Sequence, residues 1–189
     1  MQTGNGVEFK SLLTKDEYER LIQQFNGSKT DFQTNYYFDT PRFSLKALDT
    51  SLRVCERDTL ELNLKRKKGY MLNEIALPIT KEQFAEIKET GIIPLPQIQE
   101  ELLPLIGDQK VINFLSLSTL RTFFQYKSGI IYIDKTEYLG IIDYEVEYEA
   151  TNYHQGKKEF IEIINEFAIH YKKSEKKLKR AYNAYKKLH

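Results

Sequence analysis

Two glutamates lie two residues apart in a segment whose side chains alternate between polar and apolar. In residues 143–149, Glu145 and Glu147 fall on one face of an expected strand, opposite Val146. The rise of a strand places these two carboxylates about 6–7 Å apart, where like charges repel. For a single strand, one sheet face in water is the ordinary explanation. The same kind of face on several strands instead indicates a binding site.

Other expected strands carry cations on a shared face. Arg53 and Arg57 share one face, Lys65 lies on the polar face of its strand, and Arg121 lies on the polar face of another. If these faces lined the inside of a closed barrel, acidic and basic rows would face each other across a wet lumen. Arg and Lys donors suit phosphate oxygens, and carboxylates suit Mg²⁺ or Mn²⁺. The pattern therefore favours a phosphate compound with a divalent metal, and phosphoryl transfer as the chemistry.

Period-two alternation predicts the strands that position these side chains. Short links at Lys68-Gly69 and Ser128-Gly129 predict hairpins, so we expect a mostly antiparallel sheet or barrel. The expected strands cover residues 7–13, 31–39, 51–57, 59–66, 70–77, 120–128, 129–138 and 143–149.

Capping boxes predict where two helices begin. Thr14 with Glu17 starts one, and Thr80 with Gln83 starts another. An apolar stripe from about residue 157 to 171 predicts a third helix, and Ser174 is the expected N-cap of a fourth. The proline-rich stretch of residues 92–105 is expected to be irregular.

Composition narrows the class of protein. The chain of 189 residues has 28 Lys and Arg against 27 Asp and Glu, a net charge of +1, which argues against an extended nucleic-acid surface. A hydrophobic fraction of 41% predicts a packed core, and we expect one α+β domain over residues 1–189.

The single cysteine, Cys55, excludes an intramolecular disulfide and fits a reducing compartment. With no apolar run of about 18 residues and a polar start at residues 1–6, we expect a soluble cytoplasmic protein without a membrane span. The sequence carries no signal for an oligomeric state.

Short motifs follow one another along residues 7–182. The first is Glu8-Phe9-Lys10 and the last is Lys177-Leu178-Lys179-Arg180. Between them lie Tyr37-Phe38-Asp39-Thr40, Leu52-Arg53-Val54, Leu62-Asn63-Leu64-Lys65, Leu120-Arg121, Asp134 and Glu145-Val146-Glu147. In composition, order and spacing this series resembles the CYTH domains, the triphosphate tunnel metalloenzymes.

The resemblance implies an eight-stranded antiparallel β-barrel that forms a triphosphate tunnel, with flanking and C-terminal helices. It implies a small-molecule triphosphate as substrate, either inorganic triphosphate, thiamine triphosphate or a nucleoside triphosphate, hydrolysed with Mg²⁺ or Mn²⁺. The expected phosphate ligands are Lys10, Arg53, Lys65, Arg121, Lys177 and Arg180, with Arg57 as a neighbouring substitute. The expected metal ligands are Glu8, Glu74, Asp134, Glu145 and Glu147. Of all these, Lys65, Glu145 and Glu147 are the expected catalytic residues.

The chain departs from the family pattern at two positions. Gly6 stands where the first glutamate of the ExExK signature is expected, and Cys55 stands where the second arginine of the Leu-Arg-Ile-Arg strand is expected. These changes remove one carboxylate and one bidentate phosphate donor. They keep a second hypothesis open, a non-catalytic polyphosphate or nucleotide binder. A class IV-like adenylate cyclase and an enzyme acting on RNA 5′-triphosphate ends are further alternatives.

Overall fold

The computed structural model describes residues 7–25, 27–68 and 71–188. The strands are β1 (Val7–Leu13), β2 (Lys29–Asp39), β3 (Thr50–Glu56), β4 (Leu60–Lys68), β5 (Met71–Ile79), β6 (Ile112–Tyr126), β7 (Gly129–Tyr138) and β8 (Ile141–Ala150). The helices are α1 (Lys15–Gln24), α2 (Ser44–Ala47), α3 (Lys81–Thr90), α4 (Pro96–Ile106), α5 (Tyr153–Glu166) and α6 (Lys177–Leu188).

The chain divides into two compact units. The first consists of residues 1–32 and 118–189, and the second of residues 33–117. The strands form an eight-stranded sheet in the order β1-β8-β7-β6-β2-β3-β4-β5. Antiparallel pairing joins β1 with β8, β8 with β7 and β7 with β6 in the first unit, and β2 with β3, β3 with β4 and β4 with β5 in the second. The expected α+β fold, with eight antiparallel strands and flanking helices, is confirmed.

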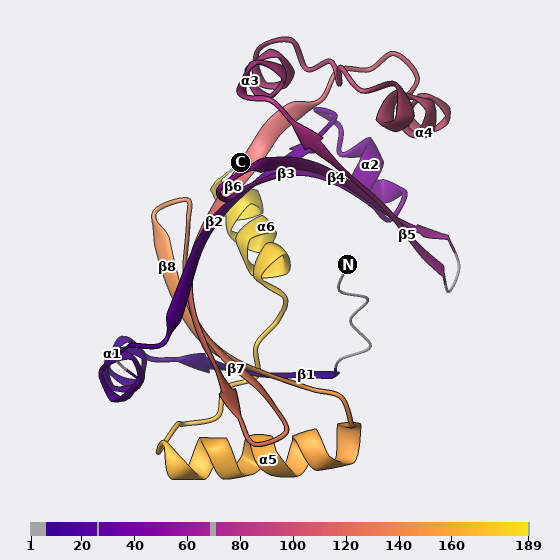
Figure 1. The fold of residues 1–189 in the computed structure, drawn as a ribbon. Helices are drawn as coiled ribbons and strands as arrows, with labels where there is room; N and C mark the ends of the chain where they lie inside the picture. Colours follow the sequence, from indigo (N-terminus) through magenta and orange to yellow (C-terminus); the bar gives the residue numbers. More distant parts are fainter. Residues whose placement is uncertain (1–6, 26, 69–70, 189) are drawn as a thin grey trace. The chain divides into compact units, whose positions relative to one another are not determined.

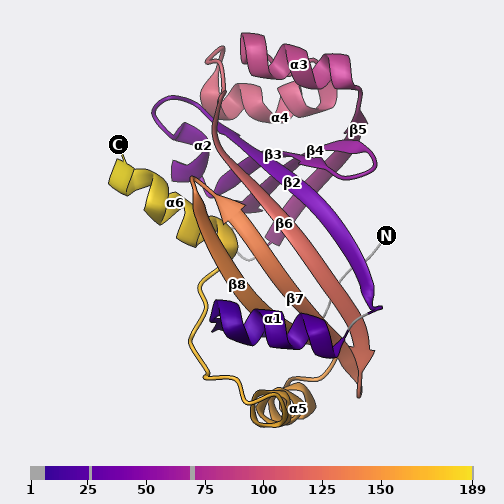
Figure 2. The same cartoon turned by 90° about the vertical axis from the view of Figure 1, so that its left-hand side faces the viewer.

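Alternation along β7 and β8 gives the sheet of the first unit one apolar face and one polar face. Ile133 and Val146 are strand neighbours on the apolar face, and both are almost completely buried. Leu21 of α1 and Ile163 of α5 belong to the same buried cluster. Figures 1 and 2 show α1 and α5 against these strands. The two helices therefore cover the apolar face and leave the polar face to a different element.

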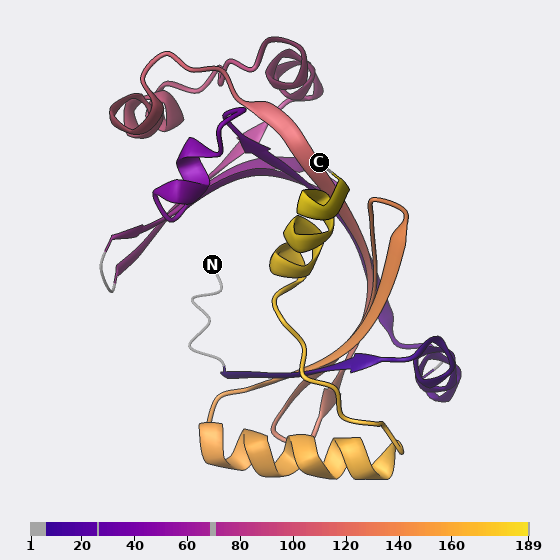
Figure 3. The ribbon, with the colours of Figure 1, turned by 180° about the vertical axis from the view of Figure 1, so that it is seen from behind.

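That element is α6, which a connecting segment of residues 167–176 brings to the polar face. The segment passes β1, where the backbone N–H of Leu12 donates to the carbonyl of Lys172 at 3.0 Å and the N–H of Lys172 donates to Ser11 Oγ at 2.9 Å. Figure 3 shows α5 and α6 on opposite sides of β1, joined by this segment. The path of the segment thus decides which side chains α6 presents to the polar face.

Glu17 fixes both the start of α1 and the connecting segment. The expected capping box is present, because Glu17 accepts a hydrogen bond from the N–H of Thr14 at 2.7 Å and donates its own N–H to Thr14 Oγ1 at 3.2 Å. The other oxygen of the buried Glu17 carboxylate accepts the N–H of His170 at 2.8 Å. Burial alone would raise the pKa of Glu17, but the N–H donors of His170 and Thr14 outweigh it and lower the pKa to about 2.

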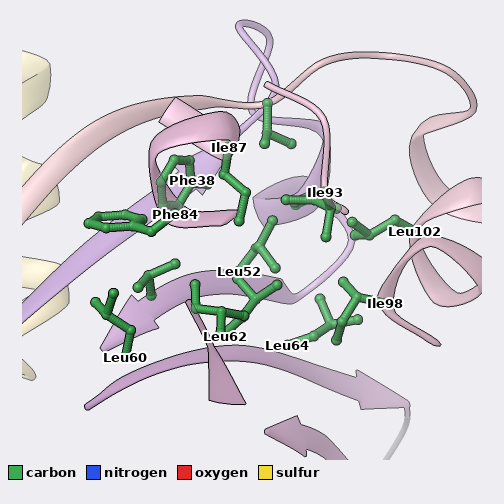
Figure 4. Close-up of a cluster of buried hydrophobic side chains, with 14 of the residues drawn as sticks. Phe38, Leu52, Leu60, Leu62, Leu64, Phe84, Ile87, Ile93, Ile98 and Leu102 are labelled. Carbon is green, nitrogen blue, oxygen red and sulfur yellow. The ribbon is translucent and has the colours of Figure 1, made fainter. Parts of the chain in front are cut away.

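In the second unit, β2 to β5 bury one face under α3 and α4. Leu52 and Leu62 of the sheet pack with Ile87 of α3 and Ile98 of α4, each with an exposed fraction of 1% or less (Figure 4). The capping box of Thr80 and Gln83 begins α3 as expected. The alternation that buries the leucines of β3 and β4 turns their polar residues to the opposite face.

The prediction that the proline-rich residues 92–105 are irregular was wrong, because most of this stretch forms α4. Proline at the first position of a helix has a suitable backbone angle and loses no hydrogen bond there, and Pro96 occupies that position. Ile98, Leu102 and Ile106 then recur every four residues and are buried. The apolar spacing therefore prevails over the proline content.

Ser174 was also assigned wrongly as a helix cap, since α6 begins only at Lys177. Strand β6 extends further toward the N-terminus than expected, starting at Ile112, and α5 starts earlier, at Tyr153. None of the helices that the structure describes is both long and apolar enough to cross a bilayer.

Replacing Glu17 tests its role as an anchor of the connecting segment. We expect Glu17→Gln to lower the free energy of unfolding by about 1–3 kcal/mol at pH 7, because charge-assisted hydrogen bonds are lost. The folded-state pKa is depressed, so this stabilisation is present above the ordinary pKa of 4.5 and is lost as the pH falls toward about 2. Urea denaturation between pH 7 and pH 2 should show the difference from the unsubstituted protein shrinking over that interval. Glu19→Gln, at an exposed site on the same helix, is the matched control. A pH-independent difference for Glu17→Gln would contradict this role.

Candidate functional site

Three carboxylates meet on the polar face of β7 and β8. Asp134 is the strand neighbour of Glu145, and Glu147 lies two residues further along β8 on the same face. The three residues are buried, with exposed fractions of 0%, 1% and 5%. One oxygen from each carboxylate lies within 4.8 Å of those of the other two. Burying three like charges together is unfavourable unless cations neutralise them.

Two cations each contact more than one of these carboxylates. Arg121 donates from Nε and Nη2 to the two oxygens of Asp134, at 2.8 and 2.6 Å, and from Nη2 to Glu147 at 2.7 Å. Lys177 Nζ lies 2.7 Å from Asp134 Oδ2 and 2.7 Å from Glu145 Oε1. It also contacts Glu147 Oε1. The ammonium of Lys177 therefore lies where all three carboxylates converge.

Arg180, one turn further along α6, binds the outer side of the cluster. Its Nη1 donates to Glu145 Oε2 at 2.7 Å, and its Nε donates to Asp143 at 2.8 Å. The hydroxyl of Ser174 donates to the same oxygen of Glu145. Sequence reasoning did not include Asp143 and Ser174 among the site residues. Asp143 could have been found from its position two residues before Glu145. The contact between the Ser174 hydroxyl and Glu145 depends on the path of the connecting segment and could not.

Lys10 enters the cluster from β1, and Glu8 does not. Lys10 is the strand neighbour of Glu147, and its Nζ lies 3.1 Å from Glu147 Oε1. Glu8 lies on the same face but pairs with Lys10 Nζ at 2.8 Å, with 52% of its side chain exposed. The structure thus brings together the three expected ligands Asp134, Glu145 and Glu147. It leaves Glu8 at the rim.

The cations favour the ionised form of Glu147. Burial opposes the charge on Glu147, but Lys177, Arg121 and Lys10 hold the pKa of its carboxyl well below its usual range. Burial likewise opposes the charge on Lys177, yet the three surrounding carboxylates raise the pKa of its ammonium. The pKa of Arg121 is raised in the same way, mainly by Asp134.

Tyr132 positions the guanidinium of Arg121. The Arg121 Cζ lies 4.4 Å from the centre of the Tyr132 ring, and the Tyr132 hydroxyl donates to Glu149 at 3.1 Å. Such stacking suits a planar guanidinium and restricts its orientation. Tyr132 was absent from the expected site, although it lies on the same face as Asp134, two residues before it.

The remaining expected phosphate ligands lie in the second unit. Lys65 and Glu74 are strand neighbours on β4 and β5, with Nζ and Oε1 3.0 Å apart. Arg57 donates to Gln33 Oε1 at 2.9 and 2.6 Å. Arg53 Nε is buried and has no hydrogen-bond partner within the described part of the chain. A buried donor without a partner is costly, so a phosphate oxygen would be a favourable ligand for it.

The two departures from the family pattern fall in different places. Cys55 lies on the same strand face as Arg53 and is partly buried, with its Sγ 4.0 Å from Gln33 Oε1. Arg57, the expected substitute, shares that contact with Gln33. Gly6 lies outside the described residues.

The chemistry of the buried cluster fits a hard divalent cation. Mg²⁺ and Mn²⁺ prefer oxygen ligands, and Asp134, Glu145 and Glu147 offer carboxylate oxygens that converge within 4.8 Å. The surrounding arginine and lysine donors suit phosphate oxygens. The geometry can therefore hold a metal ion and an anionic phosphate chain side by side.

Comparisons with known proteins agree with this geometry. The family model of the CYTH domain matches residues 5–182. "Putative triphosphatase YjbK" of Bacillus subtilis (strain 168) is 30% identical over 192 residues, with 96% of each chain covered. The crystal structure of a putative adenylate cyclase from Bacillus halodurans has a TM-score of 0.73 at 30% identity, covering 93% of this chain and 96% of that one. HpAC1 from Hippeastrum, described as a putative adenylyl cyclase with a dominant triphosphatase activity, has a TM-score of 0.73 at 20% identity, covering 96% and 95%. At that identity, the likeness to HpAC1 shows the fold alone.

The two hydrogen bonds that the Arg121 guanidinium donates to Asp134 are expected to stabilise the whole protein as well as the site. Arg121→Lys keeps the charge but cannot donate to both oxygens of Asp134 and stack on Tyr132. We expect the free energy of unfolding to fall by about 1–3 kcal/mol, measured by urea denaturation without added metal. Arg57→Lys, on an exposed residue of the other unit, should change it by less than about 0.5 kcal/mol. If the two substitutions changed the free energy of unfolding equally, the paired hydrogen bonds from Arg121 to Asp134 would not be important for stability.

Proposed function

The chain belongs to the CYTH domain family, and on that premise we propose that it hydrolyses a small-molecule triphosphate with the help of Mg²⁺ or Mn²⁺. The family is metal-dependent, and its fold is a tunnel-like barrel. The observation that carries the proposal is the buried cluster of Asp134, Glu145 and Glu147 with cations from β1, β6 and α6 around it. A cytoplasmic location is part of the proposal, since the single Cys55 fits a reducing compartment.

In this proposal the carboxylates hold the metal and the basic residues hold the substrate. Asp134, Glu145 and Glu147 are the main metal ligands, and Glu8 and Glu74 are further candidates at more exposed positions. When bound, the ion supplies positive charge beside the phosphate oxygens and lowers the pKa of the attacking water. The phosphate ligands are Lys10, Arg53, Arg57, Lys65, Arg121, Lys177 and Arg180.

Each group of residues has a distinct role in the reaction. Glu145 and Glu147 act as catalytic residues by keeping the ion at a fixed position against the substrate. Lys65 acts as a catalytic residue by neutralising charge that develops on the transferred phosphate. The arginines bind phosphate oxygens through two donors at once, which orients the chain of phosphates for in-line attack by water. Little covalent chemistry falls to the protein, as is usual in phosphoryl transfer.

A phosphate-release assay tests the proposal. Purified protein with Mg²⁺ or Mn²⁺ should release phosphate from at least one of inorganic triphosphate, thiamine triphosphate, ATP and GTP. Glu147→Gln should lower kcat/KM by at least about 100-fold, because a charged ligand becomes neutral. Circular dichroism establishes that the variant is folded. Glu137→Gln is the matched control, because Glu137 is exposed on the other face of β7. A folded protein that turns over none of these substrates would contradict the enzymatic proposal.

A second candidate, a non-catalytic polyphosphate binder, is favoured by Cys55 and Gly6. If it is correct, calorimetry should detect tight binding of inorganic triphosphate in the presence of Mn²⁺, with no phosphate released over hours. Gly6→Glu restores the expected carboxylate, and a gain of turnover in this variant would identify a decayed enzyme. Turnover by the unsubstituted chain would exclude the binder. An ATP cyclase has less support, because the curated relative is named a triphosphatase; cyclic AMP as a product would support it.

A further inference from the structure

Lys177 occupies the position in the carboxylate cluster that a metal ion would need. Its Nζ lies 2.7 Å from Asp134 Oδ2, 2.7 Å from Glu145 Oε1 and close to Glu147 Oε1. The ammonium donates hydrogen bonds to Glu145 and Glu147 and forms an ion pair with Asp134. Only 17% of the Lys177 side chain is exposed. The ammonium is thus a largely buried cation that contacts all three carboxylates.

Lys177 shares two of the three inner oxygens with other cations, because Arg121 Nη2 also contacts Asp134 Oδ2 at 2.6 Å and Lys10 Nζ contacts Glu147 Oε1 at 3.1 Å. Arg180 and Ser174 bind the second oxygen of Glu145, and Arg121 binds the second oxygen of Glu147. The two arginines therefore fix the carboxylates from outside, while Lys177 fills the space between them. Removing the ammonium would leave a set of converging oxygens still oriented by their outer partners.

Electrostatic repulsion favours either the Lys177 ammonium or a divalent metal ion between the three carboxylates, and disfavours both at once. Four cations, Lys10, Arg121, Lys177 and Arg180, contact the three buried carboxylates, so the negative charge of the carboxylates is already compensated without a metal. A divalent ion that used the same oxygens would face the ammonium at close range, and like charges in a buried site repel strongly. A lysine can respond, because four flexible carbons carry its charge and allow the ammonium to move without displacing the backbone.

We propose that Lys177 is an internal counter-cation that leaves the three carboxylates when a divalent metal ion enters, and then binds a phosphate oxygen of the substrate. This inference rests on the proposed function, because it assigns the carboxylates to a metal and the lysine to a phosphate. The same ammonium compensates the charge of the carboxylates before the metal and substrate arrive. Metal binding and phosphate binding are then coupled, since the entering ion releases a phosphate ligand.

Metal affinity of a lysine variant tests the exchange without any turnover. Lys177→Met keeps most of the length and volume and removes the charge. If the ammonium lies between the three carboxylates at least nine-tenths of the time, the Kd for Mn²⁺ should become at least about tenfold tighter in this variant. In the same variant, the Kd for inorganic triphosphate with saturating Mn²⁺ should become at least about tenfold weaker, because a charged phosphate ligand is gone. Isothermal titration calorimetry measures both values.

Lys179→Met is the matched control. Lys179 lies on the same helix, pairs with Glu175 and is 63% exposed, so its substitution removes the same charge away from the three carboxylates. Both Kd values should then stay within about twofold of those of the unsubstituted protein. An unchanged or weaker Mn²⁺ affinity in Lys177→Met would overturn the exchange while leaving the proposed function intact. Absence of Mn²⁺ binding in every variant would overturn the metal-dependent function together with the exchange.

A measurement on the unsubstituted protein covers the case in which Lys177→Met does not fold without metal. Lysine modification by acetic anhydride, followed by mass spectrometry, reports how available each ammonium is. Addition of Mg²⁺ should raise the modification rate of Lys177 at least about fivefold, because its partners are taken by the ion. The rate at Lys179 should not change. A Lys177 rate that is independent of Mg²⁺ would overturn the proposal.

Discussion

The burial of three carboxylates within 4.8 Å of one another is the constraint on which the first unit depends. Basic side chains from β1, β6 and α6 reach Asp134, Glu145 and Glu147 and offset the unfavourable burial of these carboxylates. This requirement explains why a C-terminal helix crosses to the polar face of the sheet. It also explains why the segment leading to that helix is fixed by specific hydrogen bonds to Ser11, Leu12 and Glu17.

Strand alternation serves the core and the site at once. The residues of β7 and β8 that face α1 and α5 form the apolar cluster, and the residues between them form the carboxylate site. A shift of one residue in the register of β8 would bury the glutamates in the apolar core and expose Val146 on the polar face. Packing on one side therefore positions the chemistry on the other. The second unit repeats the arrangement, with Leu52 and Leu62 buried and Arg53 and Lys65 on the opposite face.

Features set by local sequence could be predicted, and features set by long-range packing could not. The capping boxes of Thr14 and Thr80 and the alternation in β8 are local, and the structure has them as expected. The helix α4 was missed because proline content outweighed its apolar spacing in the prediction. The structure brings together the motif residues Asp134, Glu145, Glu147, Arg121, Lys177 and Arg180, and their roles in a site stay a prediction. The sequence could not predict that Lys177 pairs with all three carboxylates, because this contact depends on the path of residues 167–176 past β1.

A crystal structure of the protein with Mn²⁺ and inorganic triphosphate would show where the metal ion and the Lys177 ammonium lie. The anomalous signal of manganese locates the ion independently of the protein atoms. We expect a manganese peak within coordination distance of Asp134, Glu145 and Glu147, with Lys177 Nζ moved from these carboxylates onto a phosphate oxygen. Manganese bound elsewhere, with Lys177 still between the three carboxylates and the phosphates away from the polar face, would contradict this expectation.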